Sequence, residues 1–261
     1  MRLKGEFCMG LASVFSFVAL ILLIMVNVGQ INPGKASRSI SMVNMNISMF
    51  GTALQAATGD PPNGLFNSAN WTISQNQGLQ SIYSWGLYAV CGYNVTERVQ
   101  GGCSNSSLAH PFTPFDVIVG DTPARFNTPV TYFISNSEGV EKFVNSGYFK
   151  TLTHVAFYLL FIATIATGAA FVIGLFKSTV TFVLSTLLVI ISAIFVLVSS
   201  VLWSTVIKQA RTINDVRTNQ NLSIGIVIHQ GNALYMLWAV FALLVVSTIP
   251  YTASCRTFRR R

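Results

Sequence analysis

Four long apolar runs constrain the fold of this chain more than any other feature. They span residues 7–29, 153–176, 180–206 and 233–253, and none contains Asp, Glu, Lys or Arg. A helix rises about 1.5 Å per residue, so each run is long enough to cross a hydrocarbon core of about 30 Å. Charged residues make up only 9% of the chain, against about 25% in soluble domains. The sequence therefore predicts a membrane α-helical protein, a bundle of four transmembrane helices.

Basic residues beside these runs predict their orientation. Residues 1–6 and the tail 254–261 are rich in Lys and Arg, which are retained in the cytosol when they flank a span. We therefore expect a multi-pass protein with both termini and the turn 177–179 in the cytosol. Anionic lipid is the expected partner of the tail. A signal peptide would have an apolar region of about 7–15 residues and a small-x-small cleavage site; the first run is longer and Met25–Val28 offers no such site, so we expect it to stay uncleaved.

Small residues recur at helical spacing in the second run. The stripe is Ala163, Ala166 or Thr167, Ala170 and Gly174. Small side chains let membrane helices approach closely, although Ala and Gly are also common in such helices for no particular reason. The stripe predicts one helix–helix contact.

The two polar segments, 30–152 and 207–232, are expected outside the cell. Hydrophobic residues alternate with polar ones from Val43 to Met49, a period of two that indicates a half-buried strand. The remaining patterns predict further strands at 81–90, 95–99, 115–119, 130–134 and 224–228, turns at 60–64 and Tyr93-Asn94, and a helix within 138–150. That helix would lie along the outer membrane surface or pack on the domain. Helical spacing of Ile207, Ala210, Ile213 and Val216 predicts that the third span continues outward.

Two of the four cysteines, Cys91 and Cys103, fall in the large outer segment. In an oxidising space they can close a loop of about a dozen residues, which would stabilise the fold by about 3 kcal/mol. The alternative is two buried, unpaired thiols. Cys8 and Cys255 fall at the inner membrane edge, where thiols stay reduced. Each is either a site of S-acylation or an unmodified thiol.

Five Asn-x-Ser/Thr sequences are candidate sites of N-glycosylation. They start at Asn46, Asn70, Asn94, Asn105 and Asn221. All five lie in the two segments expected outside, which supports the proposed topology.

The large outer segment contains Trp85-Gly86-Leu87-Tyr88, followed by Cys91 and Cys103. With four spans and cytosolic termini, this resembles the claudin-like tetraspans, whose signature is a tryptophan, then Gly-Leu-Trp-x-x-Cys, then a second cysteine. Trp71 would be the leading tryptophan, and Tyr88 replaces the tryptophan of the signature. The resemblance implies an extracellular β-sheet domain pinned by the cysteine pair.

The length of the outer segment, together with Cys103-Ser104 and the run Pro111–Asp116, is more similar to the fungal SUR/PalI family of claudin-like proteins. That resemblance implies a plasma-membrane protein associated with eisosomes, cell-wall integrity or, in the PalI branch, ambient-pH signalling. The PalI branch often has a long cytosolic tail, so the short tail here favours the eisosome-associated branch.

Three classes of function are open to a chain of this kind. The favoured one is a non-enzymatic organiser of plasma-membrane domains, with membrane lipids, neighbouring membrane proteins or further copies of itself, and cell-wall polymer as partners. The alternative is an auxiliary subunit of a channel, pH sensor or cell-wall synthase. A transporter needs ionisable groups within the bilayer, and none lies deep in any run. His154 and His229, near outer helix ends, are pH-sensing or merely interfacial.

The sequence gives no reason to expect an enzyme. It has no convincing pair of carboxylates, no Gly-x-Ser-x-Gly motif and no metal-spaced Cys/His set, so no catalytic residue, cofactor or metal is predicted. The net charge of +8 is spread over several segments rather than gathered in one patch, and no nucleic-acid partner is expected. The motif residues would then be structural: Trp85 and Tyr88 pack the sheet or sit at the membrane interface, and Gly86 allows close backbone approach.

Overall fold

A computed structural model describes residues 2–32, 35–67, 73, 75–94, 102–176, 179–217 and 222–259. The chain divides into two compact units. Unit 1 comprises Met1–Asn27, Val155–Leu202 and Leu234–Arg261, and unit 2 comprises Val28–His154 and Trp203–Ala233. Each unit is described separately below.

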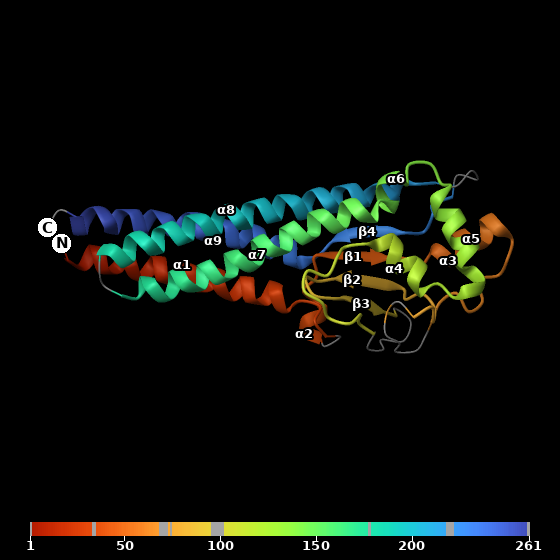
Figure 1. The fold of residues 1–261 in the computed structure, drawn as a ribbon, viewed down its shortest axis with the longest axis horizontal. Helices are drawn as coiled ribbons and strands as arrows, with labels where there is room; N and C mark the ends of the chain where they lie inside the picture. The colour runs from red at the N-terminus through yellow and green to blue at the C-terminus, as the bar shows by residue number, and fades with distance from the viewer. Residues whose placement is uncertain are drawn as a thin grey trace. The chain divides into compact units, whose positions relative to one another are not determined.

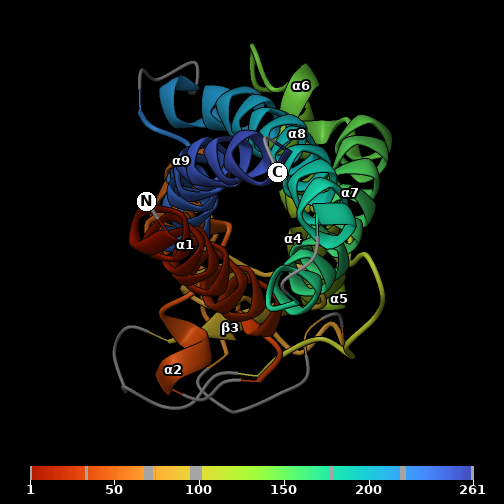
Figure 2. The ribbon, with the colours of Figure 1, turned by 90° about the vertical axis from the view of Figure 1, so that its left-hand side faces the viewer.

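Long helices make up unit 1. They are α1 (Arg2–Val28), α7 (Ser146–Gly174), α8 (Thr179–Ala210) and α9 (Asn232–Arg259), seen end-on in Figure 2. Three described stretches are long and apolar enough to cross a membrane: Ser146–Gly174, Val180–Asp215 and Asn232–Ile249. In α1 the apolar stretch that meets the description is shorter, Ala12–Val28. Unit 1 is therefore a bundle of apolar membrane helices, and the fourth span remains a prediction.

The outward faces of unit 1 are apolar. Ile165, Val180 and Ile249 are 58%, 77% and 65% exposed, and many other large apolar side chains on α7, α8 and α9 are also exposed. Soluble monomers rarely expose so extensive an apolar surface, and such surfaces mark contact with lipid or protein.

A seam of small residues joins α7 to α8. Ser185, Ser192 and Ser199 of α8 donate hydrogen bonds to the carbonyl oxygens of Ala170, Ala163 and Ala156 of α7, at 2.7, 3.4 and 2.9 Å. All six residues are fully buried. On both helices the members recur at seven-residue intervals but in opposite order, so the helices are antiparallel. The predicted stripe is confirmed, with Thr167 rather than the half-buried Ala166 as the buried member.

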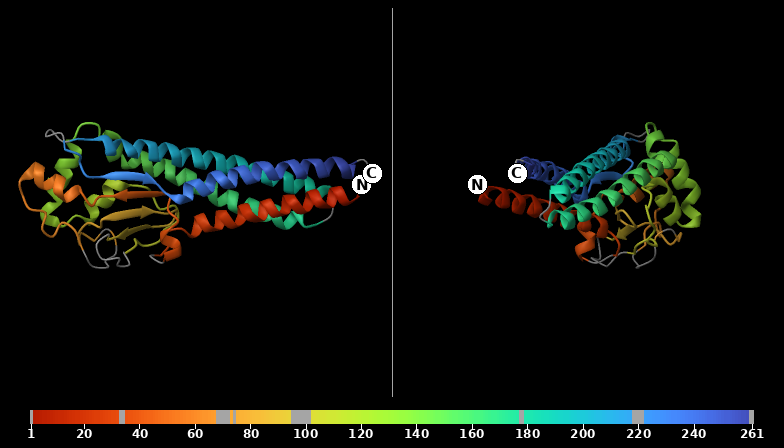
Figure 3. Two further views of the ribbon diagram at one scale, coloured as in Figure 1. Left: turned by 180° about the vertical axis from the view of Figure 1, so that it is seen from behind. Right: turned by 60° about the vertical axis from the view of Figure 1, so that its left-hand side comes forward.

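Unit 2 is built on a four-stranded antiparallel sheet of order β3-β2-β1-β4 (Figures 1 and 3). The strands are β1 (Val43–Asn46), β2 (Ile82–Trp85), β3 (Val90–Tyr93) and β4 (Val227–Gln230). In register, Val43 lies opposite both Trp85 and Gln230, and Ile82 lies opposite Tyr93. The predicted period of two is confirmed from Val43 to Ile47, because Val43, Met45 and Ile47 are fully buried while Asn44 and Asn46 are half-buried. It does not extend to Met49, which is 64% exposed and immediately precedes α3.

The second outer segment supplies the edge strand, as predicted, although the strand is Val227–Gln230 rather than 224–228. A 3-10 helix, η1 (Arg211–Asp215), continues directly from α8. The apolar positions Ile207 and Ala210 at the end of α8, Ile213 in η1 and Val216 just after it are buried, which confirms the predicted outward continuation of this helix.

Two predicted strands are wrong, because residues 115–119 and 130–134 are helical. They lie in α4 (Pro114–Asp121) and α5 (Ala124–Ser135). Pro114 is at the first helical position, where its missing N–H costs nothing. In α5, Phe126, Val130 and Phe133 are buried at helical spacing, so the 3.6-residue period outweighs the local β-branched composition.

The hairpin between β2 and β3 turns earlier than predicted. Residues 81–90 are not one strand: β2 ends at Trp85, and the N–H of Gly86 donates to the carbonyl of Ala89 at 2.9 Å to close the turn. Tyr93 is consequently the last residue of β3 rather than part of a turn, and residues 95–99 lie outside the described part of the chain.

Short helices complete unit 2. They are α2 (Lys35–Arg38), α3 (Phe50–Thr58) and α6 (Glu141–Val144). Helix α6 and the start of α7 account for the helix predicted within 138–150, and Val140 and Phe143 on its apolar face are buried. The turn predicted at 60–64 is present, with the N–H of Leu65 donating to the carbonyl of Pro62 at 3.0 Å.

Candidate functional site

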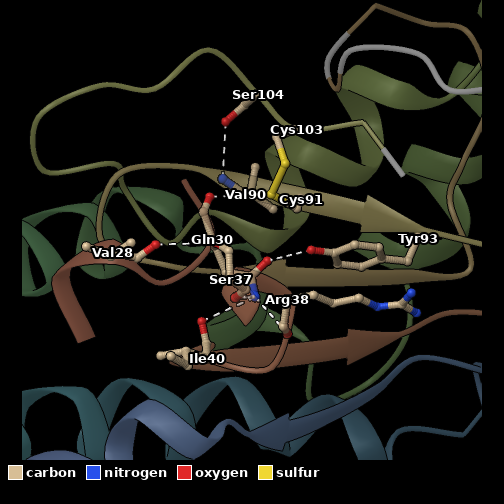
Figure 4. Close-up of a disulfide and its surroundings, with 10 residues drawn as sticks. All are labelled: Val28, Gln30, Ser37, Arg38, Ile40, Val90, Cys91, Tyr93, Cys103 and Ser104. Carbon is tan, nitrogen blue, oxygen red and sulfur yellow. Dashed lines mark hydrogen bonds between the residues drawn. A yellow bond between two sulfur atoms is a disulfide. The ribbon is translucent and has the colours of Figure 1, made fainter. Parts of the chain in front are cut away.

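The two cysteines of the outer segment form a disulfide. The Sγ atoms of Cys91 and Cys103 are 2.03 Å apart, and the two residues are separated by 12 positions in the sequence (Figure 4). The reading as two unpaired thiols is therefore wrong. Residues around Cys103 run antiparallel beside β3: the N–H of Gly92 donates to Gly102, and the N–H of Ser104 donates to Val90, both at 2.8 Å. The disulfide thus fixes an additional extended segment to the edge of the sheet.

Gln30, two residues beyond the end of α1, lies against this disulfide. Its side chain is fully buried, and its backbone has a φ of 58°. Its carbonyl oxygen lies 3.4 Å from Sγ of Cys91. Its Oε1 accepts a hydrogen bond of 2.8 Å from the hydroxyl of Tyr93, on the same face of β3 as Cys91.

The amide nitrogen of Gln30 holds the loop that follows α1. Nε2 donates to the carbonyls of Ser37, Arg38 and Ile40 at 2.9, 3.0 and 3.2 Å, so three acceptors share two N–H groups. Figure 4 shows how this one side chain connects α2 to the disulfide-bearing strand. We call Gln30, Tyr93 and the Cys91–Cys103 disulfide the Gln30 cluster.

Tyr93 makes one contact through its ring and another through its hydroxyl. The guanidinium carbon of Arg38 lies 4.3 Å from the centre of its ring, a distance typical of a cation–π contact. Burial raises the pKa of the Tyr93 hydroxyl to about 12, while the nearby Arg38 charge acts in the opposite direction. The hydroxyl therefore stays protonated and remains a donor to Gln30 at neutral pH.

The motif residues have distinct structural roles in unit 2. Trp85 is fully buried, and Leu87 is 1% exposed. A Cβ on Gly86 would collide with the carbonyl oxygen of Gly29 and come within 2.7 Å of Cβ of Gln30. Tyr88 is half-buried, and burial raises the pKa of its hydroxyl. Trp71, the expected leading tryptophan, lies outside the described residues.

Phe112 is the centre of an aromatic cluster on the opposite face of the sheet. Its ring contacts Trp85 edge-on with centroids 5.0 Å apart, and it also contacts Phe149 at 5.5 Å and Trp203 at 6.4 Å. All four side chains are buried. Its backbone N–H donates to Oγ1 of Thr153 at 3.3 Å. The cluster packs the motif strand β2 against residues of α7 and α8 that belong to unit 2.

A buried tyrosine–carboxylate pair connects β2 to α4. The hydroxyl of Tyr83 donates to Oδ2 of Asp121 at 2.6 Å and accepts from the N–H of Gln80 at 3.0 Å. Burial, followed by the charge of Asp121, raises the pKa of Tyr83 well above its usual value. Neither Gln30 nor Asp121 was singled out from the sequence, because neither belongs to a motif and both partners are distant along the chain.

The predicted modification sites are only partly described. Asn105 is exposed, whereas Asn46 and Asn94 are half-buried, and their Oδ1 atoms accept from the N–H of Ser48 and from Oγ of Ser81. Asn70 and Asn221 lie outside the described residues. So do the side chains of Cys8 and Cys255, in α1 and α9. Glycosylation and acylation at these positions stay predictions.

The described residues contain one contact between a serine and a histidine. They include no cluster of three His, Cys, Asp or Glu side chains that could hold a metal ion. Oγ of Ser107 lies 3.2 Å from Nδ1 of His110, but no described contact gives His110 the orienting carboxylate of a catalytic triad. Burial lowers the pKa of His110. His229 lies within β4, opposite Asn44 and three residues before the start of α9, and His154 lies in α7.

Comparison with known proteins gives one family. No curated protein matches the chain at a significant level. The model of the SUR7/PalI family matches residues 8–249, which include all of unit 2 with its disulfide and most of unit 1. The chain therefore belongs to the SUR7/PalI family of membrane proteins.

Proposed function

We propose that this chain is a non-enzymatic, claudin-like four-span protein that organises domains of the plasma membrane, of the eisosome and cell-wall-integrity type. Unit 2 would lie outside the cell, with both termini in the cytosol. It would contact neighbouring proteins or wall polymer, while the helices of unit 1 contact lipid and lateral partners.

One observation carries this proposal: two groups of buried polar side chains in unit 2 bond to other parts of the same unit. Gln30 bonds to Tyr93 and to three backbone carbonyls, and Tyr83 bonds to Asp121. Groups that saturate each other in the interior specify a rigid scaffold, whereas a catalytic site needs groups directed at a substrate. A rigid, disulfide-linked domain suits a protein that acts through its surfaces.

Unit 1 supports a structural role by its composition. The described stretches 155–176 and 179–202 contain no Asp, Glu, Lys, Arg or His. Ion and proton pathways in membranes depend on such groups. Instead, the serines of α8 in this seam donate hydrogen bonds to backbone carbonyls of alanines in α7. Such bonds stabilise the association of the two helices.

The test is to follow a fluorescently tagged chain in the cells from which it comes and to remove it. We expect stable membrane patches, and we expect other patch residents to disperse when the chain is deleted. The Cys91→Ser/Cys103→Ser variant should fail to restore the patches, whereas a Val201→Leu control should restore them. Uniform distribution of the chain, with no effect of its deletion on other proteins, would refute the proposal.

Purification in mild detergent separates this proposal from the alternative of an auxiliary subunit. An organiser should copurify with several proteins and with lipid in variable amounts. Copurification of one large membrane protein in fixed stoichiometry would instead identify the chain as a subunit of that protein.

A further inference from the structure

Leu108 is the most exposed large apolar side chain in the described part of unit 2. It is 74% exposed, at the tip of a turn formed by Ser107–His110. Exposed leucines are common on proteins, so exposure alone carries no meaning. What distinguishes Leu108 is the way in which its turn is fixed and the place where it lies.

The turn is held rigidly to the motif hairpin. The N–H of Ser107 donates to the carbonyl of Tyr88 at 2.9 Å, and the N–H of His110 donates to the carbonyl of Leu87 at 3.0 Å. Ala109 is 3% exposed and has a φ of 55°, a conformation that is unfavourable for a residue with a side chain. The fold thus buries Ala109 and keeps Leu108 pointing outward.

This turn lies at the end of the sheet where the chain leaves unit 2. Gly86, next to Leu87, contacts Gly29 just beyond α1. Phe112, two residues after His110, bonds to Thr153 of α7.

The remaining exit points lie at the same end of the sheet. Phe112 contacts Trp203 of α8. The N–H of Met42, beside β1, donates to Trp85, and the N–H of Ala233 in α9 donates to the neighbouring Ser41. All four passages from unit 2 into an apolar helix are therefore near the Ser107–His110 turn.

We propose that the Ser107–His110 turn anchors unit 2 in the outer leaflet, with Leu108 at the boundary between lipid headgroups and acyl chains. The inference rests on the proposed function, because it requires unit 2 to lie outside the cell. Lipid is the occupant that the position favours, since apolar helices enter the bilayer from this end of the unit. Tyr88, bonded to the turn through its carbonyl, is an aromatic residue with a polar hydroxyl, a type enriched at membrane interfaces.

Two further apolar side chains at this end of the sheet are also exposed. Val28 and Ile31, on either side of Gly29-Gln30, are 51% and 41% exposed. The edge therefore presents apolar groups from two separate segments of the chain. The polar residues Asn105, Ser106 and Ser107 precede Leu108 and are exposed, as suits a segment among headgroups.

Tyr132 provides a matched control because it is 70% exposed but lies at the other end of the sheet. It is on α5, and the adjacent Phe133 packs on Phe50 with centroids 5.9 Å apart. Phe50 begins α3, beyond the end of β1 that is remote from Met42. The inference predicts that lipid reaches position 108 and not position 132.

The test places a photoreactive aliphatic diazirine residue, close to leucine in size, at position 108 or at position 132 of the full-length chain. Each protein is reconstituted in phosphatidylcholine vesicles and illuminated, and its peptides are analysed by mass spectrometry. We expect a mass shift of one phospholipid on the peptide containing position 108, and only water addition at position 132. Non-reducing mapping should recover the Cys91–Cys103 pair in both proteins, which shows that unit 2 has folded.

Each other outcome overturns the inference. Water addition alone at position 108 would show that the turn is in solution, and cross-linking to a peptide of a second chain would show a protein contact instead of lipid. The proposed function is tested separately in intact cells, by attaching a membrane-impermeant maleimide to a cysteine introduced at position 132. If that position is labelled from outside but position 108 gives no lipid adduct, only the anchor is wrong. If it is labelled only after lysis, the outward orientation of unit 2 is wrong.

Discussion

The hydroxyl of Tyr93 donates a hydrogen bond of 2.8 Å to Oε1 of Gln30, a residue 63 positions away in the sequence. Tyr93 lies in the same strand as Cys91, and Gln30 lies just beyond α1. Through this bond and the contact of Cys91 with the Gln30 carbonyl, the end of the first apolar helix is fixed to the disulfide. Changes at one member of the Gln30 cluster should therefore be detected at the others.

Replacing Tyr93 with Phe should destabilise unit 2 by about 1–3 kcal/mol. The ring would still fit, but Oε1 of Gln30 would stay buried without a donor, and an unsatisfied buried polar group costs about that much. The change can be measured as the denaturant midpoint of unit 2, followed by limited proteolysis of the purified protein. Reduction of the Cys91–Cys103 disulfide by dithiothreitol should also become faster, because local opening is easier.

Tyr132→Phe is the control for this substitution, since the Tyr132 ring is 70% exposed on α5. It removes the same hydroxyl without leaving a buried acceptor. The free energy of unfolding should match that of the wild type within about 0.5 kcal/mol, as is usual for surface changes. Equal midpoints for Tyr93→Phe and wild type would show that the Gln30 cluster does not stabilise unit 2.

Replacing Gly86 with Ala should destabilise unit 2 by about 1–3 kcal/mol or prevent its folding, because overfilling a packed site costs about that much. The added Cβ meets backbone, namely the Gly29 carbonyl, and not the flexible end of a side chain. Non-reducing gel analysis and surface expression are suitable measurements. We expect a reduced yield of protein with the correct disulfide.

Gly147→Ala is the matched control. Its Cβ would meet only Oδ1 of Asn145 at 3.8 Å, and Gly147 lies in the first turn of α7, where Ala favours the helix by up to about 1 kcal/mol. Expression of this variant should equal or exceed that of the wild type. A Gly86→Ala protein as stable as Gly147→Ala would contradict the close approach of the motif hairpin to residues 29 and 30.

The apolar helices were predictable because partition into lipid depends on composition over about 20 residues, which no distant contact alters. Strand β1 was predictable for a related reason, since one buried face imposes the alternation of Val43, Met45 and Ile47. Helices α4 and α5 were predicted as strands because their five-residue apolar windows are rich in β-branched side chains. The signals that decide for helix, Pro114 and the spacing of Phe126, Val130 and Phe133, extend over longer windows.

The disulfide was predictable because only two cysteines lie in the outer segment. Gln30 was not, since a glutamine carries no motif and its importance depends on which strand the fold places beside it. Asp121 was noted as an acidic residue, but its partner Tyr83 lies 38 positions earlier in the sequence, and no local pattern connects the two. In both cases the local sequence gives no sign of a contact that only the tertiary structure creates.

Unit 2 should lose stability at alkaline pH. Burial raises the pKa of Tyr93 to about 12 and that of Tyr83 well above its usual value, whereas an unfolded tyrosine has a pKa of about 10. The unfolded state therefore releases these protons first, so stability is constant below pH about 10 and falls as the pH rises towards 12 and beyond. Unfolding can be followed together with the ultraviolet absorbance of tyrosinate, with free thiols alkylated beforehand to prevent disulfide exchange.

The Tyr93→Phe variant tests whether ionisation of Tyr93 contributes to the loss of stability at alkaline pH. It should be less stable than wild type at pH 8, but its stability should fall less steeply above pH 10, because one of the titrating groups is gone. Identical slopes for the two proteins would show that Tyr93 does not contribute to the alkaline transition.

The α7–α8 seam predicts that a larger side chain at Ser192 will separate these two helices. The Oγ of Ser192 lies 3.4 Å from the Ala163 carbonyl, and both residues are fully buried at the middle of the seam. Ser192→Leu should cost about 1–3 kcal/mol through overpacking, whereas Ser192→Ala keeps the small volume and should cost only about 0.6 kcal/mol, the average for a hydrogen bond between membrane helices.

Val201→Leu on the same helix enlarges a side chain that is 47% exposed and should have no effect. Resistance to SDS-induced unfolding in mixed micelles ranks the variants, and the expected order is wild type and Val201→Leu first, then Ser192→Ala, then Ser192→Leu. If Ser192→Leu were as resistant as Val201→Leu, close approach of the helices at small residues would not be what holds α7 to α8.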